Sequence, residues 1–79
     1  MKDREIIEVI QNIFRDILNN RDLLVSNESK PSDIEGWDSL ANINIIVALE
    51  EQFKIKLGLD EITNVNSVKD LVSIVKNHL

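Results

Sequence analysis

The chain of 79 residues contains no cysteine. This absence excludes disulfides, metal sites built on thiolates and a thiol nucleophile supplied by the protein itself. The single histidine, His78, is expected in the last turn of a C-terminal helix, where the helix dipole favours a cation, and it is assigned no catalytic role. One histidine among scattered carboxylates does not make a metal site. Any thiol chemistry must therefore come from an attached group.

Basic residues are also few, with nine Lys and Arg against fourteen Asp and Glu and a net charge of −5. A nucleic-acid surface needs clustered Lys and Arg, so we expect no nucleic-acid partner and favour basic proteins as partners. The N-terminal segment is amphipathic and not an uninterrupted apolar stretch. We therefore expect neither a signal peptide nor a membrane span, and a cytoplasmic location.

Apolar residues are plentiful enough for a small core. They make up 43% of the sequence, which argues against disorder throughout. A chain this short buries only about 60 to 65% of its unfolded surface, which leaves no room for a deep catalytic pocket. We expect one domain, residues 1–79, without internal repeat or linker.

Apolar residues follow helical spacing in three segments. The first is expected to run from Asp3 to Leu18 and to stop at the Asn19-Asn20 pair, because Asn tolerates the left-handed conformation that ends helices. The last begins at Ser67, with Asp70 three residues later, a pattern typical of a helix start. Its expected apolar face comprises Val68, Leu71, Val72, Val75 and Leu79.

The middle segment, which ends at Phe53, is the most apolar in the chain. Asp38 or Ser39 is expected to begin it, since short polar side chains accept hydrogen bonds from the free N–H groups of a first helical turn. The β-branched residues 45–47 would also suit a buried strand, but a run of fifteen residues without Gly or Pro is long for one. The expected buried face is Leu40, Ile43, Ile46, Val47, Leu49 and Phe53.

The segments between these helices have weaker patterns. A long structureless loop is unusual in a small domain, so we expect residues 23–25 to enter the core, leaving the polar tip from Ser26 to Asp33 exposed with a turn at Pro31. Residues 54–57 are expected to form an extended connector, and residues 59–63 one short helical turn. The whole pattern predicts an all-α four-helix bundle with three main helices, a short third helix and a long loop between the first two.

Ser39 lies where the polar loop meets the middle helix. A helix N-terminus collects N–H donors without partners and the positive end of the backbone dipole. A phosphate attached to a serine hydroxyl at this place would be stabilised. An ordinary helix cap would explain the same serine without any modification.

Residues on both sides of Ser39 form an extended motif. They are Gly36-Trp37-Asp38-Ser39-Leu40, then an apolar helix that closes with Ala48-Leu49-Glu50-Glu51-Gln52-Phe53. This motif resembles that of the acyl carrier protein family, and the similarity extends over nearly the whole chain, including Ser67-Val68-Lys69-Asp70-Leu71. The resemblance implies a carrier, not an enzyme, with 4′-phosphopantetheine on the Ser39 hydroxyl and acyl groups held as thioesters on its terminal thiol.

The resemblance also implies partners. A phosphopantetheinyl transferase, using Mg²⁺, would move the arm from coenzyme A to Ser39, and acyl-loading and acyl-transferring enzymes would act on the thiol. Asp38 would either cap the helix or help the transferase engage, and Leu40 would combine core packing with a transferase contact. Glu50 and Glu51 would form a solvated helix face that could also meet Arg or Lys of partner enzymes. A monomer is expected.

Two positions depart from the family pattern. Carriers of fatty acid synthesis usually have acidic residues two and five positions after the serine, where this chain has Ala41 and Asn44. That helix face is where partner enzymes dock in the family. The departure therefore favours a carrier of one specialised pathway over general fatty acid synthesis.

Several alternatives stay open at this point. Trp37, the only tryptophan, is expected to anchor the loop to the bundle in preference to stacking on the pantetheine arm. A peptidyl or aryl carrier would use the same serine with a different loading enzyme. A helical protein-interaction domain would leave Ser39 as a cap only.

Overall fold

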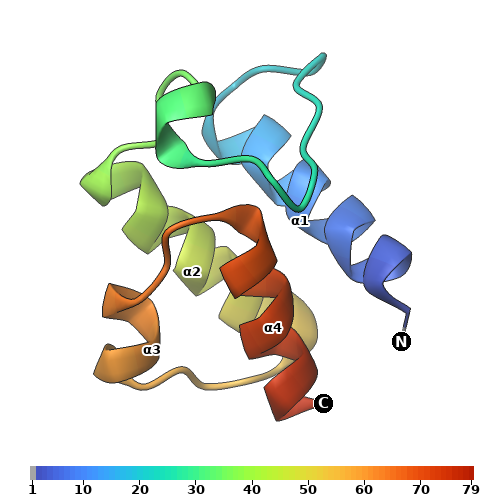
Figure 1. The fold of residues 1–79 in the computed structure, drawn as a ribbon, viewed down its shortest axis with the longest axis vertical. Coiled ribbons are helices and arrows are strands. Elements are labelled where there is room, and N and C mark those ends of the chain that lie inside the picture. Colours follow the sequence, from blue (N-terminus) through green and yellow to red (C-terminus); the bar gives the residue numbers. More distant parts are fainter. Residues whose placement is uncertain (1) are drawn as a thin grey trace.

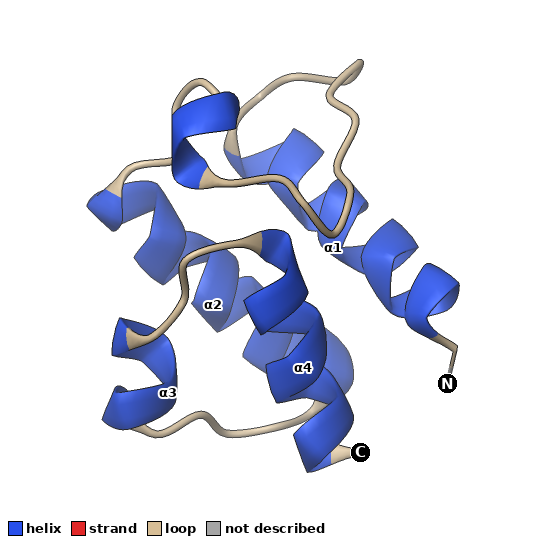
Figure 2. Cartoon of the chain, in the orientation of Figure 1, coloured by secondary structure: helices blue, strands red, loops and turns tan. Residues whose placement is uncertain are grey.

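Three main helices enclose one core in the computed structural model, which describes residues 2–79 (Figure 1). The elements in order are α1 (Asp3–Ile17), a short 3₁₀ helix η1 (Pro31–Asp33), α2 (Ser39–Phe53), α3 (Leu59–Thr63) and α4 (Val68–His78). Within the described range all regular structure is helical, as Figure 2 shows. The expected all-α bundle, with three main helices, a short third one and a long loop after the first, is confirmed.

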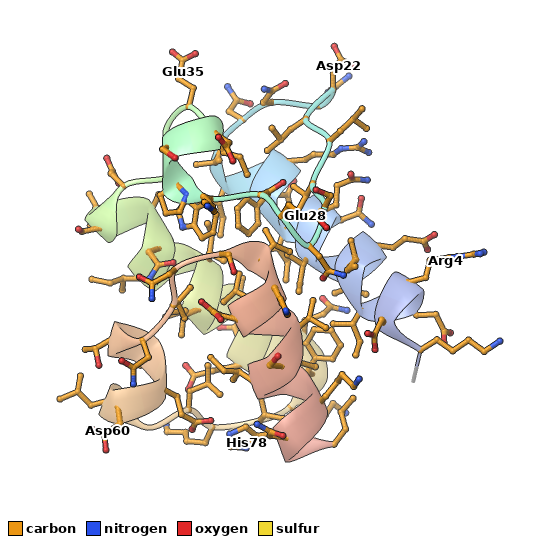
Figure 3. The ribbon with its side chains drawn as sticks, in the orientation of Figure 1. Arg4, Asp22, Glu28, Glu35, Asp60 and His78 are labelled. Atoms are coloured by element: carbon orange, nitrogen blue, oxygen red, sulfur yellow. The ribbon has the colours of Figure 1, made fainter. Side chains whose placement is uncertain are left out.

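The helices meet because each main helix contributes an apolar face to the same core. α1 packs against both α2 and α4. Among residues 2–79 no buried side chain is polar or charged, and charged residues such as Arg4, Asp22, Glu35 and Asp60 project away from the bundle (Figure 3). The buried residues are Ile6, Ile10, Ile13, Phe14, Val25, Ile34, Trp37, Ile45, Ile46, Leu49, Leu57, Val68, Leu71, Val72 and Val75.

The helix ends follow the polar residues that the sequence indicates. α1 stops at Ile17, one residue earlier than expected, and Asn19 then adopts the left-handed conformation with φ of 52°. At the start of α4, the Ser67 hydroxyl accepts a hydrogen bond from the Asp70 N–H at 3.4 Å, as the Ser-x-x-acid pattern predicts. Leu79 lies beyond α4 and is 60% exposed, so its expected place on the buried face is wrong.

The long loop between α1 and α2 is held by side chains of α1. Gln11 Oε1 accepts a hydrogen bond from the Val25 N–H at 2.9 Å, and Arg15 Nε donates to the Leu23 carbonyl at 2.8 Å. These bonds turn Val25 into the core, while Leu24 between them points outward and is 77% exposed, so its expected burial is wrong. An extended segment alternates its side chains, which explains why neighbours differ in this way.

The polar tip of that loop supplies hydrogen-bond acceptors to the first N–H groups of α4. The carbonyl of Ser29 accepts from the Val68 N–H at 2.9 Å, and that of Asn27 accepts from the Lys69 N–H at 3.1 Å. Residues 26–33 were expected to be exposed, but Asn27 and Ser29 are half-buried by this contact. The expected turn at Pro31 is confirmed as η1, which lies over one end of the bundle (Figure 1).

The short helix α3 is tied to α4 by a polar contact. Glu61 accepts from the Gly58 N–H at 3.1 Å at the start of α3, and its Oε2 lies 2.8 Å from Nε2 of His78 on α4. The hydrogen bond from the Gly58 N–H, and after it the one from His78, lowers the pKa of the Glu61 carboxyl. His78 therefore has a structural neighbour in α3.

The orientation of α2 differs from the sequence expectation. Its buried residues are Ile45, Ile46 and Leu49, and Phe53 is half-buried. Leu40, Ile43 and Val47, all expected in the core, are 70%, 54% and 47% exposed. From Ser39 to Leu49 the helix has no charged residue. The spacing of apolar residues therefore could not mark which side faces water.

Adjacent substitutions on α2 test this orientation. Ile46→Ala should lower the free energy of unfolding by about 2–5 kcal/mol, because it opens a cavity at a side chain that is 2% exposed. Val47→Ala should change it by much less, about 0.5 kcal/mol, because Val47 is already 47% exposed in the folded chain. Urea unfolding followed by Trp37 fluorescence measures both values. Equal losses for the two variants would show that the described orientation of α2 is wrong.

Candidate functional site

The N-terminus of α2 separates two roles that the sequence left open. Asp38 is the N-cap residue: its Oδ1 accepts a hydrogen bond from the Ala41 N–H at 2.8 Å, and its carbonyl accepts from the Asn42 N–H at 2.8 Å. Ser39 is the first residue of the helix, and it is exposed. The capping role of Asp38 is therefore confirmed. The hydroxyl of Ser39 is left free of that duty.

A tight turn directs the chain into this helix start. Gly36 has φ of 90°, a left-handed conformation that residues with a side chain rarely adopt. The turn is closed by hydrogen bonds from the Trp37 N–H to the Ile34 carbonyl at 3.2 Å and from the Asp38 N–H to the Gly36 carbonyl at 3.0 Å. Because Ile34 and Trp37 are both buried, the turn holds Ser39 at a defined place on the surface.

Trp37 connects this turn to two helices. Its side chain is 4% exposed and meets Phe14 of α1 edge to face, with ring centroids 4.8 Å apart and planes at 80°. Its indole Nε1–H donates to Oδ1 of Asn42 on α2 at 2.9 Å. Such a ring pair stabilises a core by about 0.5–1.5 kcal/mol beyond area burial. The predicted role of Trp37 as an anchor of the loop is confirmed.

A pocket of about 220 Å³ opens beside Ser39. No basic side chain borders it, and the only charged one is that of Asp38. Its walls come from η1, the turn before α2, the first turn of α2 and the connector between α3 and α4. The lining residues are Pro31, Trp37, Asp38, Ser39, Asn42 and Val65.

The residues of α2 that were expected to recognise partners differ in how exposed they are. Leu40, Asn44 and Glu51 are exposed on α2, and Ala41 is half-buried. Core packing by Leu40, which the sequence analysis expected alongside a partner contact, is wrong, because 70% of its surface is accessible. Leu40, Ala41 and Asn44 lie within about two turns of Ser39, whereas Glu51 lies near the other end of α2.

Glu50 departs from the solvated face assigned to it. It is half-buried, and its Oε2 accepts a hydrogen bond from the Leu57 N–H at 2.9 Å. Its carbonyl also accepts from the Ile55 N–H at 3.1 Å, just after Lys54 ends the helix in the left-handed conformation. Glu50 thus closes the connector between α2 and α3.

Sequence reasoning missed two features of this region. One is the hydrogen bond between Asn42 and Trp37. The two residues are five positions apart, and helical spacing does not predict a contact between residues at this separation. The other is an exposed apolar stripe made of Leu40, Ile43 and Val47, which we call the α2 stripe. Its spacing of three and four residues places the three side chains along one side of the helix.

These features determine the chemistry that the site can perform. An exposed primary alcohol stands at the positive end of a helix dipole, which favours a phosphate attached to it. Within residues 2–79 no three His, Asp or Glu side chains are placed to hold a metal ion. The same range contains no helix long and apolar enough to cross a membrane. The free hydroxyl, the helix start and a pocket lined by three apolar residues fit a 4′-phosphopantetheine group on Ser39.

Comparison with known proteins gives the family of the chain. Residues 8–75 match the family model described as the phosphopantetheine attachment site. The acyl carrier protein of Clostridium acetobutylicum is 36% identical over 73 residues, which cover 92% of this chain and 95% of that protein. The acyl carrier protein of Buchnera aphidicola is 30% identical over 94% of this chain and 92% of its own length.

A solved structure agrees with these sequence matches. The solution structure of the holo acyl carrier protein from Geobacter metallireducens superimposes with a TM-score of 0.82 at 33% identity, covering 91% of this chain and 83% of that one. Both the fold and the sequence thus relate the chain to phosphopantetheine-bearing carriers, which are not enzymes. The chain belongs to the acyl carrier protein family.

Proposed function

We propose that Ser39 carries the 4′-phosphopantetheine arm and that residues 1–79 act as one carrier domain for acyl thioesters. The observation that supports this proposal most directly is the division of labour at the start of α2. Asp38 caps the helix, and Ser39 is exposed with its hydroxyl uncommitted to the cap. A serine that only caps the helix would be expected at the N-cap position, which Asp38 occupies.

The residues around Ser39 prepare it for modification by a phosphopantetheinyl transferase. Ser39 Oγ would form a bond to the phosphorus that bears pantetheine in coenzyme A. The pyrophosphate bond would break, adenosine 3′,5′-bisphosphate would leave, and the hydroxyl proton would pass to a base of the transferase. The helix dipole of α2 would favour the resulting anionic phosphodiester by about 0.3–1 kcal/mol. Once attached, the arm supplies the thiol that the chain lacks.

The carrier itself contributes position and a docking surface. Tethering keeps an acyl group at high local concentration for successive enzymes. The α2 stripe lies directly after Ser39, and between Ser39 and Leu49 there is no charged residue that could pair with a basic partner. With Ala41 and Asn44 in place of acidic residues, this surface favours enzymes of a specialised pathway over those of general fatty acid synthesis. We also infer a monomer working in the cytoplasm.

Acyl carriage is supported over the rival readings. The named relatives are acyl carriers, which favours an acyl cargo over a peptidyl or aryl one. A helical interaction domain without modification would need no free hydroxyl beside a pocket. The identity of the acyl group is best read from the mass of the species on the protein isolated from its own host.

The attachment point can be tested by mass. When the chain is produced together with a phosphopantetheinyl transferase, native mass spectrometry should find a single chain that has gained one phosphopantetheine group. Ser39→Ala should gain nothing, because no other hydroxyl takes its place at the helix start. Ser67→Ala, which alters the cap of α4, is the matched control and should still gain the group. Equal modification of Ser39→Ala would refute the attachment site.

Substitution of Asp38 separates its two expected roles. Asp38→Ala should lower the free energy of unfolding by about 0.5–2 kcal/mol, because the N–H of Ala41 loses its acceptor. Asp38→Asn should keep nearly all of that stability, since Asn caps helices about as well as Asp. If the carboxylate also engages the transferase, Asp38→Asn should lower kcat/KM for modification while remaining stable. Unchanged kcat/KM in Asp38→Asn would restrict Asp38 to capping.

The α2 stripe can be tested by the kinetics of the same transferase. Ile43→Asn should lower kcat/KM by about tenfold, because an apolar side chain that is 54% exposed in the free carrier would no longer be buried by the enzyme. The effect should persist at high salt, since apolar contacts are not screened as ion pairs are. Gln52→Ala, an exposed change outside the stripe, should have little effect. Equal kcat/KM for wild type and Ile43→Asn would contradict this docking surface.

A further inference from the structure

The pocket beside Ser39 has a composition that the attachment of an arm alone does not require. Three apolar residues, Pro31, Trp37 and Val65, line it, and its polar residues besides Ser39 are Asp38 and Asn42. These residues belong to four separate segments of the chain, and Ser39 lies at the edge where they meet. A group tethered to Ser39 therefore has a neighbouring surface that it could occupy.

The side chain of Asn42 is oriented by Trp37. An indole N–H can only donate, so the atom of the Asn42 amide that faces Nε1 at 2.9 Å is the oxygen. The NH₂ group of the same amide then points the other way with its two donors. Asn42 follows Ser39 by three residues, so the two side chains are neighbours on the helix surface, about 5–6 Å apart at their Cβ atoms. Trp37 thus presents an amide donor beside the attachment point.

The charge of the pocket determines which part of the phosphopantetheine arm can lie inside it. Asp38 is among the lining residues and no basic residue there balances its charge, so the anionic phosphodiester is disfavoured inside and stays toward solvent. The next part of the arm is the pantoyl segment, which is uncharged. It has a carbon with two methyl groups, followed by a hydroxyl and a carbonyl. Methyl groups suit the walls of Trp37, Pro31 and Val65, and an oxygen acceptor suits the Asn42 NH₂.

We propose that this pocket is the seat of the pantoyl segment, with Asn42 donating a hydrogen bond to its hydroxyl or carbonyl oxygen. Trp37 acts as the positioning residue that fixes the amide. The inference rests on the proposed attachment to Ser39 and assigns binding roles to residues of this chain. The seat restrains the part of the arm nearest the protein, while the distal part with the thiol remains free to reach partner enzymes.

Nuclear magnetic resonance of the modified carrier tests the proposal. The protein would be labelled with ¹³C and ¹⁵N and loaded with an unlabelled arm, and its loading would be verified by intact mass. Filtered nuclear Overhauser spectra should then show contacts between the pantoyl methyl protons and the ring protons of Trp37. These contacts should be lost in Asn42→Asp, which keeps an oxygen for the indole N–H but removes the donor. The indole N–H resonance should stay near its wild-type position.

Two further variants keep the test specific. Asn42→Ala removes the donor without adding charge and should also lose the contacts. Asn44→Asp introduces the same charge on the same helix at an exposed residue outside the pocket, and should retain them. Contacts that are absent from the loaded wild type, or that survive both Asn42 variants, would overturn the seat. A chain that gains no mass on Ser39 would overturn the proposed function as well, so the two failures are distinguishable.

Discussion

The position of Ser39 depends on how Trp37 is held. This one side chain packs edge to face on Phe14 of α1 and donates a hydrogen bond to Asn42 of α2, so it links the turn before α2 to two helices at once. The bond matters because an indole buried to this extent would otherwise carry an unpaired N–H, which costs about 1–3 kcal/mol. The turn at Gly36 then has a single direction in which to place the next residues. The Ser39 hydroxyl is therefore held at a defined position although it is exposed.

The second constraint is that the distribution of polar and apolar residues along α2 does not determine which of its sides is buried. Successive residues of a helix are rotated by about 100°, and from Ser39 to Leu49 apolar residues occur on all sides. Polar contacts near both ends of the helix supply the missing information. Asn42 accepts from the Trp37 indole, and Glu50 accepts from the Leu57 N–H, and both bonds lie on or beside the buried side. They leave the α2 stripe on the opposite side, facing water.

This constraint explains what the sequence could predict and where it failed. Helix existence and most boundaries followed from spacing and caps, because α1 and α4 have charged residues that mark their outer faces. The buried face of α2 could not be derived, since its orientation depends on Trp37 and Leu57, which lie outside the helix. Leu24 was misplaced for a related reason: the hydrogen bonds from the Val25 N–H to Gln11 and from Arg15 to the Leu23 carbonyl decide which residue of the loop turns inward. The motif predicted that α2 begins at Asp38 or Ser39, as the structure shows. The contact of Asn42 with Trp37 could not be predicted, because it crosses the turn before the helix.

The same arrangement accounts for an apolar surface that a small domain would be expected to bury. Fully burying each large aliphatic side chain would stabilise the fold by about 1.5–3 kcal/mol, so exposing Leu40, Ile43 and Val47 leaves a substantial contribution unused. Under the proposed function several enzymes would have to recognise the carrier around the Ser39 hydroxyl, and the pocket beside this residue holds only about 220 Å³. Ser39 lies between the buried side of α2, where the pocket opens, and the stripe. The proposed seat would restrain the pantoyl segment on one side of Ser39, and the α2 stripe would give partners an uncharged docking surface on the other. Partners could then recognise the carrier while the thiol stays mobile.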